Sequence, residues 1–178
     1  MTPVRRALLL VGVGGMAVTA GYLASLWRIG GLGPVPAADA AAAILSSRLT
    51  TLDGAEQTLA GFHGRVLVIN YWATWCAPCR EEIPLFVRFQ REYADKGVQF
   101  VGIAVDQADK VRDFGKEFQI NYPLLIAGME AVDLSRQAGN TAGVLPYTLM
   151  LDRSGRIAAS LVGGISEERL RAELARLL

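Results

Sequence analysis

The chain contains two cysteines, Cys76 and Cys79, which stand three residues apart in the segment Tyr71–Pro84, YWATWCAPCREEIP. A thiolate is a nucleophile, a metal ligand and a partner in disulfide exchange, so a pair at this spacing can do chemistry. The residues that follow have apolar positions at helical spacing, including Ile83 and Phe86. A helix N-terminus lowers the pKa of a thiol from about 8.5 to as little as about 3.5. The pattern therefore predicts a reactive Cys76 at the helix start, with Cys79 one turn further in.

Three other roles for the two thiols compete with a redox role. A zinc site needs two further ligands, but the chain has no third cysteine and a single histidine, His63. We interpret His63 as structural or solvent-exposed. A purely structural disulfide would close a short loop and contribute little stability. Inert core cysteines are disfavoured by Pro78 and Arg80, which stand beside the thiols. A redox-active pair is the interpretation that the residues favour.

The elements that position the pair are those of an α/β domain. An apolar, β-branched run predicts a buried strand directly before the cysteines, and Asp53-Gly54 and residues 152–155 predict hairpin turns. Gly139 predicts a helix end, Ser166 a helix N-cap, and Pro84 a kink. The expected strands are 66–71, 99–105, 123–127, 147–151 and 156–162, and the expected helices are 77–94, 109–118, 130–138 and one after Ser166. Their order predicts a central mixed sheet flanked by helices.

The N-terminal part of the chain has the composition of a membrane segment. Ala7–Trp27 runs without a charge, and as a helix it would reach about 31 Å, close to the thickness of a bilayer core. Arg5 and Arg6 before it favour a cytoplasmic N-terminus, 1–6, with the rest of the chain outside. We predict an uncleaved transmembrane anchor at 7–27. A cleaved signal peptide, of the twin-arginine type included, and a buried core helix remain alternatives.

Residues 28–45 are predicted to form a linker, because they are mostly glycine, proline and alanine. Residues 46–178 then form one domain, long enough for a core of its own. The chain has a formal net charge of +1 and no basic stripe, so we predict no nucleic-acid partner. We also predict no metal and no other cofactor.

The segment 68–84, VINYWATWCAPCREEIP, resembles the thioredoxin superfamily, and within it the TlpA/ResA-like branch of membrane-anchored, extracytoplasmic thiol-disulfide oxidoreductases. The resemblance covers about residues 47–178. It implies a thioredoxin fold with an N-terminal β-hairpin and a helix-strand insertion at about 107–127. It also implies a redox-active disulfide between Cys76 and Cys79, and a cis-proline, Pro146, that faces the pair. An ordinary trans proline that starts a strand is the alternative at that position.

The same resemblance implies roles for residues around the pair. Trp75, Ala77, Pro78 and Leu145 are expected to contact substrate, with Trp75 walling the site. Trp72 either joins that wall or belongs to the core.

Three further positions bear on how the chemistry is tuned. Asn70 stands where thioredoxin has a buried aspartate, so that proton relay is absent. Glu82 is expected to modulate the thiol pKa and to transfer protons. Its alternative is a solvated carboxylate that favours the helix dipole, which suits Glu81 better. Tyr147 follows the proline where most relatives have threonine, which leaves substrate contact on that side open.

The function implied is an extracytoplasmic thiol-disulfide oxidoreductase that reduces disulfides in exported proteins, for example apocytochrome c. The resemblance implies a DsbD/CcdA-like membrane electron donor and a place on the periplasmic side of the inner membrane. The Ala77-Pro78 pair adds no cation, which favours a low reduction potential. Two alternatives fit less well. A Sco-like copper protein calls for C-x-x-x-C and a distant histidine, and a peroxiredoxin-like peroxidase calls for P-x-x-x-[ST]-x-x-C.

Overall fold

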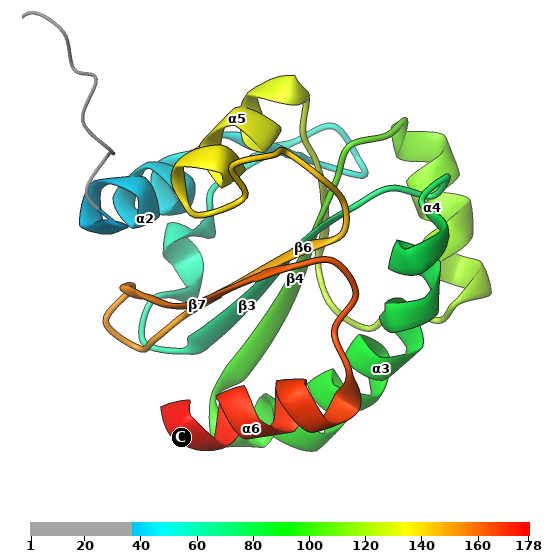
Figure 1. Cartoon of the computed structure of the whole chain (residues 1–178). Helices are drawn as coiled ribbons and strands as arrows, with labels where there is room; N and C mark the ends of the chain where they lie inside the picture. The colour runs from blue at the N-terminus through cyan, green and yellow to red at the C-terminus, as the bar shows by residue number, and fades with distance from the viewer. Residues whose placement is uncertain (1–36) are drawn as a thin grey trace, which may run out of the picture. The chain divides into compact units, whose positions relative to one another are not determined.

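The computed structural model describes residues 37–178, which form a seven-stranded mixed sheet covered by helices on both faces (Figure 1). The strand order is β2-β1-β5-β4-β3-β6-β7. β3 is parallel to β4 and β4 to β5, whereas the other neighbours are antiparallel. The strands are β1 Leu49–Thr51, β2 Glu56–Gln57, β3 Val66–Trp72, β4 Val98–Ala104, β5 Leu124–Ile126, β6 Tyr147–Leu151 and β7 Ile157–Val162. The central position of β3 buries all seven of its residues.

The helices lie in two layers. Figure 1 shows α2 and α5 on one face of the sheet and α3 and α6 on the other. The α-helices are α2 Ala37–Ser46, α3 Ala77–Tyr93, α4 Ala108–Glu117, α5 Met129–Gln137 and α6 Glu167–Leu177, and short 3-10 turns span Leu59–Phe62 and Ala94–Lys96. Side chains of β3 alternate between the layers, because successive residues of a strand point to opposite faces. Val66 and Val68 join the core under α3 and α6, and Leu67 and Ile69 join the core under α2 and α5.

The predicted α/β class, the order of the elements and the mixed sheet are confirmed. Each predicted strand and helix in the domain is present, with ends that move by one or two residues. The β1–β2 hairpin turns at Asp53-Gly54, where Gly54 has a φ of 86° that suits glycine. α4 and β5 occupy the expected insertion. Ser166 caps α6 by accepting a hydrogen bond from the Arg169 N–H.

The prediction that all of residues 28–45 form a linker was wrong for its second half. Residues 37–46 form α2, which packs against α5 and buries Ala40, Ala41 and Ile44. Alanine has the highest helix propensity, and these three residues share one helix face. The domain therefore begins before residue 46, because a stretch that resembles a spacer in composition carries an apolar face.

The predicted membrane anchor, 7–27, lies outside the described residues. Between residues 37 and 178, no helix has both the length and the apolar character needed to cross a bilayer.

Candidate active site

The two cysteines lie at the junction between β3 and α3, and they are joined by a disulfide. Cys76 is the N-cap residue of α3, and Ala77 and Pro78 form the start of its first turn. The first backbone N–H groups of a helix have no partner within it and carry partial positive charge. Cys76 is 6% exposed and Cys79 is fully buried. Cys76 is therefore the cysteine at the N-terminus of the helix and the more exposed of the two.

The peptide bond between Leu145 and Pro146 is cis, as the resemblance implied. Tyr147 pairs with Tyr71 in the antiparallel β6–β3 ladder, so Pro146 lies next to the end of β3. The chain leaves β3 at this end to reach Cys76. The Pro146 carbonyl accepts a hydrogen bond from the Gly163 N–H at 2.9 Å, which ties the proline to the segment that follows β7.

The four residues expected to contact substrate differ in exposure. Trp75 is 69% exposed, although it is an aromatic side chain directly before the reactive cysteine. Ala77 and Pro78 are exposed on the first turn of α3, and Leu145 is half-buried. Trp72, by contrast, is buried and packs against Phe114 in a tilted arrangement, with ring centroids 5.1 Å apart, so it belongs to the core.

Tyr147 does not enter the site. Its side chain is fully buried in the core under α2 and α5, and its hydroxyl donates to the Ala138 carbonyl at 2.6 Å. The bulk of this residue is therefore accommodated on the face of the sheet opposite to α3.

Glu82 is buried, in contrast to the solvated carboxylate that was its alternative. It is 4% exposed, and its two oxygens accept hydrogen bonds from the Asn70 amide at 2.8 Å and the Ile165 N–H at 3.1 Å. Asn70 also donates to the Thr148 hydroxyl at 3.3 Å. Asn70 thus occupies the buried position below the motif without carrying a proton, and the titratable group there is Glu82.

Burial raises the pKa of Glu82 to about 7, even though the hydrogen bonds from Ile165 and Asn70 act to lower it. The carboxyl lies one helical turn after Cys79, on the same side of α3. It also lines a surface recess together with Pro78, Leu85 and Ile165, so a proton can reach it from solvent. A group with this pKa exchanges protons near neutral pH, which is the range in which thiols must be deprotonated to react.

A further polar residue, Asp106, holds the loop before Cys76 and was missed by the sequence analysis. Its carboxylate accepts hydrogen bonds from both the backbone N–H and the hydroxyl of Thr74. Burial acts to raise the pKa of Asp106, but the hydrogen bonds from Thr74 and Gln107 lower it overall. The signal was available: parallel strands end at the same edge, and Asp106 stands two residues beyond the end of β4.

Arg80 adds a second connection between the motif and α4. Its guanidinium lies over the rings of Phe114 and Phe118, 5.2 and 5.7 Å from their centroids. One nitrogen donates to the Thr74 carbonyl at 3.4 Å. The loop from 73 to 75 is therefore held from α3 and from the segment that leads into α4.

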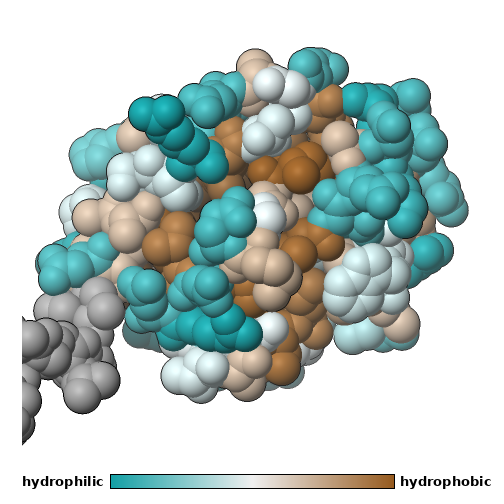
Figure 2. Space-filling view, turned by 90° about the horizontal axis from the view of Figure 1, so that it is seen from above, coloured by the Kyte–Doolittle hydropathy of each residue, from teal (hydrophilic) through white to brown (hydrophobic). Residues whose placement is uncertain are grey.

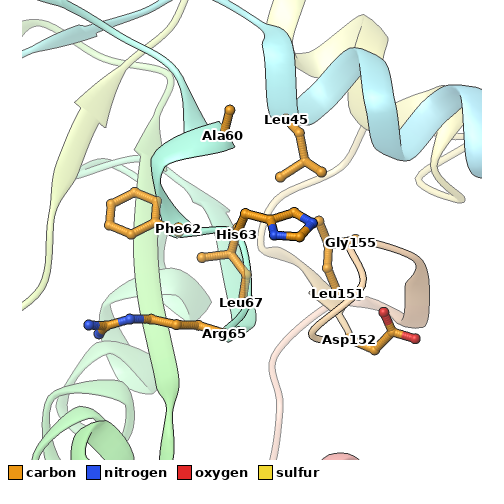
Figure 3. Close-up of a pocket in the computed structure, with 10 residues that line it drawn as sticks. Leu45, Ala60, Phe62, His63, Arg65, Leu67, Leu151, Asp152 and Gly155 are labelled. Atoms are coloured by element: carbon orange, nitrogen blue, oxygen red, sulfur yellow. The ribbon is translucent and has the colours of Figure 1, made fainter.

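His63 lies at the other end of the sheet. It is exposed and lines a small pocket with Leu45, Leu67 and Leu151, toward which its ring extends (Figure 3). Leu67 pairs with Leu151 at the start of β3, whereas the cysteines follow its end. The interpretation of His63 as structural or exposed agrees with this position, and the pocket is separate from the disulfide.

Comparisons with known proteins agree with this geometry. The model of the Redoxin family matches residues 34–178. The thiol-disulfide oxidoreductase ResA of Bacillus thuringiensis is 29% identical over 132 residues, covering 72% of this chain and 73% of the relative.

Two solved structures are similar to the domain. One is a thiol:disulfide interchange protein of the thioredoxin family from Chlorobium tepidum, with a TM-score of 0.67 and 30% identity over 83% of this chain and 99% of the other. The second is a secreted thiol-disulfide isomerase from Corynebacterium glutamicum, with a TM-score of 0.66 and 27% identity over 74% and 82% of the two chains.

The sheet order, the disulfide at the start of α3 and these similarities define a thiol-disulfide oxidoreductase of the thioredoxin superfamily, similar to the TlpA/ResA branch. The chain belongs to the Redoxin family.

The raised pKa of Glu82 predicts a particular pH dependence of stability. The carboxyl keeps its proton up to about pH 7 in the folded protein, but only up to about 4.5 when unfolded. The folded state then binds more protons in this window, so the free energy of unfolding should fall as the pH rises from about 4.5 to about 7. Glu82→Gln should remove this fall, which corresponds to about 3 kcal/mol. Urea denaturation across this range measures it.

Glu81→Gln is the matched control, because Glu81 is an exposed carboxylate on the same helical turn. The stability profile of this variant should run parallel to that of the parent. If the Glu82→Gln profile also runs parallel to the parent profile, Glu82 does not titrate as a buried group.

Proposed function

We propose that this protein is an extracytoplasmic disulfide reductase that acts on exported proteins through Cys76 and Cys79. One observation carries the proposal: the disulfide joins the N-cap residue of α3 to a residue one turn further in. This arrangement gives the first thiol a stabilised thiolate and the second thiol a short reach to it.

The proposed reaction begins with the reduced pair. The Cys76 thiolate attacks one sulfur of a substrate disulfide, a mixed disulfide forms, and the other substrate sulfur leaves as a thiolate that takes up a proton. The Cys79 thiol then loses its proton and attacks the Cys76 sulfur. The Cys76–Cys79 disulfide forms, and the second substrate sulfur leaves. Two electrons pass from the pair to the substrate.

Glu82 is proposed to accept the proton that Cys79 loses. Its pKa of about 7 allows the carboxyl to be ionised before the transfer and protonated after it. The recess lined by Pro78, Glu81 and Ile165 then gives the proton an exit to solvent. The hydrogen bonds from Asn70 and Ile165 hold the carboxyl in place during the transfer.

Proteins, rather than small thiols alone, are proposed as substrates. Trp75 and Val144 are exposed apolar side chains, and each lies within two residues of a reactive or cis-proline position. Figure 2 shows hydrophobic residues interspersed with hydrophilic ones on the face of the domain seen from above. Exposed apolar surface of this kind favours contact with another chain. Trp75, Ala77, Pro78 and Leu145 are the proposed contact residues.

The direction of the reaction is proposed from the motif. Ala77 and Pro78 carry no cation that would stabilise a thiolate further, so a potential low enough for reduction is favoured. Apocytochrome c is one candidate substrate among exported thiol proteins. The oxidised pair would be reduced again by a DsbD/CcdA-like membrane electron donor.

The proposed location is the outer side of the cytoplasmic membrane, with residues 7–27 as the anchor. The apolar run and the preceding Arg5 and Arg6 support this orientation. The Corynebacterium glutamicum relative is described as secreted, which also favours export.

A reporter fused after Leu178 tests the orientation. A reporter that is active only outside the cytoplasm should work at this position, and the protein should fractionate with membranes. Activity of a cytoplasm-only reporter would overturn the orientation. Complete release into the soluble fraction would overturn the anchor and leave the location intact.

Replacing Cys76 and replacing Cys79 should block the reaction at different steps. Cys76→Ser should abolish disulfide reduction at the first step and trap nothing. Cys79→Ser should still attack substrate and then stall as a mixed disulfide, because no second thiol is present to resolve it. Non-reducing gels of both variants, recovered from cells after an acid quench, show the adducts.

Adducts that form on Cys79→Ser alone and disappear with reductant are the expected result. Adducts mainly on Cys76→Ser would reverse the two roles. The absence of adducts on either variant would contradict an exchange mechanism.

A further inference from the structure

The segment that leads into the cis-proline is held by one buried side chain, that of Asn140. Asn140 lies in the loop after α5 and is fully buried. Its amide oxygen accepts a hydrogen bond from the Val144 N–H at 3.0 Å, and its amide nitrogen donates to the Val144 carbonyl at 3.0 Å. The side chain therefore pairs with Val144 as a neighbouring β-strand would, with one bond in each direction.

The side chain of Asn140 is itself fixed by Ser135 of α5. Its amide nitrogen also donates to the Ser135 hydroxyl at 3.0 Å, and that hydroxyl donates to the Val132 carbonyl at 2.7 Å. Ser135 is fully buried in α5. Both donors and the acceptor of the Asn140 side chain are thus used, and a fully satisfied buried amide has one defined orientation.

The bonds at Val144 determine which backbone groups remain without a hydrogen-bond partner in the segment Val144–Pro146. Both hydrogen-bonding groups of Val144 are occupied by Asn140, and the Pro146 carbonyl is occupied by the Gly163 N–H. Leu145 lies between them, and in residues 37–178 neither its N–H nor its carbonyl has a hydrogen-bond partner. Its side chain packs against both halves of the core, so Leu145 is anchored through its side chain and not through its peptide groups.

We propose that Asn140 is a positioning residue for protein substrates: it fixes Val144–Pro146 so that an extended substrate chain can lie along Leu145 while its disulfide meets Cys76. The proposal rests on the disulfide exchange proposed above. Asn140 touches neither the cysteines nor the substrate. A small disulfide needs only the sulfur of Cys76, whereas a polypeptide also needs the backbone edge at Leu145. Comparing the two kinds of substrate therefore separates the positioning role of Asn140 from disulfide exchange at Cys76.

The experiment compares Asn140→Ala with the parent, using reduced full-length protein and two probes, insulin and hydroxyethyl disulfide. The rate constant for oxidation by insulin should fall by about tenfold, because the two bonds that hold Val144 are lost. The rate constant for hydroxyethyl disulfide should stay within about twofold of the parent value, since Cys76 is untouched.

Ser135→Ala is the matched control. It removes a buried hydrogen bond to Asn140 but leaves both bonds to Val144 in place. Its melting temperature should fall, as for any lost buried hydrogen bond, yet the ratio of the two rate constants should remain that of the parent. If Asn140→Ala does not fold, Asn140→Asp replaces it. Aspartate keeps the acceptor for Val144 N–H and loses the donors, so the ratio should shift in the same direction.

The outcomes are distinct. A fall confined to insulin supports the proposal. Equal rate constants for variant and parent, or an equal fall with both probes, would overturn it and leave the disulfide exchange intact. A parent protein that reduces neither probe would instead contradict the proposed function.

Discussion

The structure depends on one junction, at which the buried strand β3 ends and α3 begins with Cys76 as its N-cap. β3 is fixed by a parallel neighbour on one side and an antiparallel neighbour on the other. Its end therefore cannot move without disturbing the whole sheet. The first turn of α3, whose N–H groups have no partner within the helix, therefore starts directly after Cys76, and the adjoining strand β6 places Pro146 at the same edge. Disulfide exchange at this position follows from where the fold places the two cysteines.

Several polar residues around the junction each fix a different segment of it. Asp106 fixes the Thr74 backbone on one side, and Asn140 fixes the Val144 backbone on the other. Glu82 lies below, where burial rather than a neighbouring charge dominates its pKa. In each case a side chain satisfies backbone or amide groups that would otherwise be unpaired, and unpaired buried polar groups are costly. The side chain of Trp75, by contrast, is exposed.

Much of the fold was predictable from the sequence, because its signals are local. The β-branched run before the cysteines, the glycine turns and the Ser166 cap each specify their own element. α2 was missed because composition suggested a spacer, whereas three residues on one helix face, Ala40, Ala41 and Ile44, decide the packing. The position of Asp106 could have been inferred from the parallel strands β3 and β4, which end at the same edge of the sheet. The role of Asn140 could not, because it depends on a turn that brings Val144 onto its side chain only after folding.

The burial of Glu82 likewise could not be predicted from neighbouring residues in the sequence. Its spacing from Cys79 was visible in the sequence, but a carboxylate in the first turns of a helix is as often solvated, as Glu81 is here. What distinguishes the two is the Ile165 N–H, which comes from a segment distant in the chain and donates a hydrogen bond to the Glu82 carboxylate. The cis peptide before Pro146 was expected only through the resemblance, since no local pattern requires it.

Cys76 and Cys79 are proposed to form a reversible and reducing couple. Equilibration of the protein in redox buffers, followed by quantification of the two thiols, measures the potential of this couple. One two-electron transition is expected, with a potential nearer to the value of thioredoxin, about −270 mV, than to that of DsbA, about −120 mV. A potential close to that of DsbA would contradict the assignment as a reductase, and the absence of a reversible transition would contradict the exchange mechanism itself.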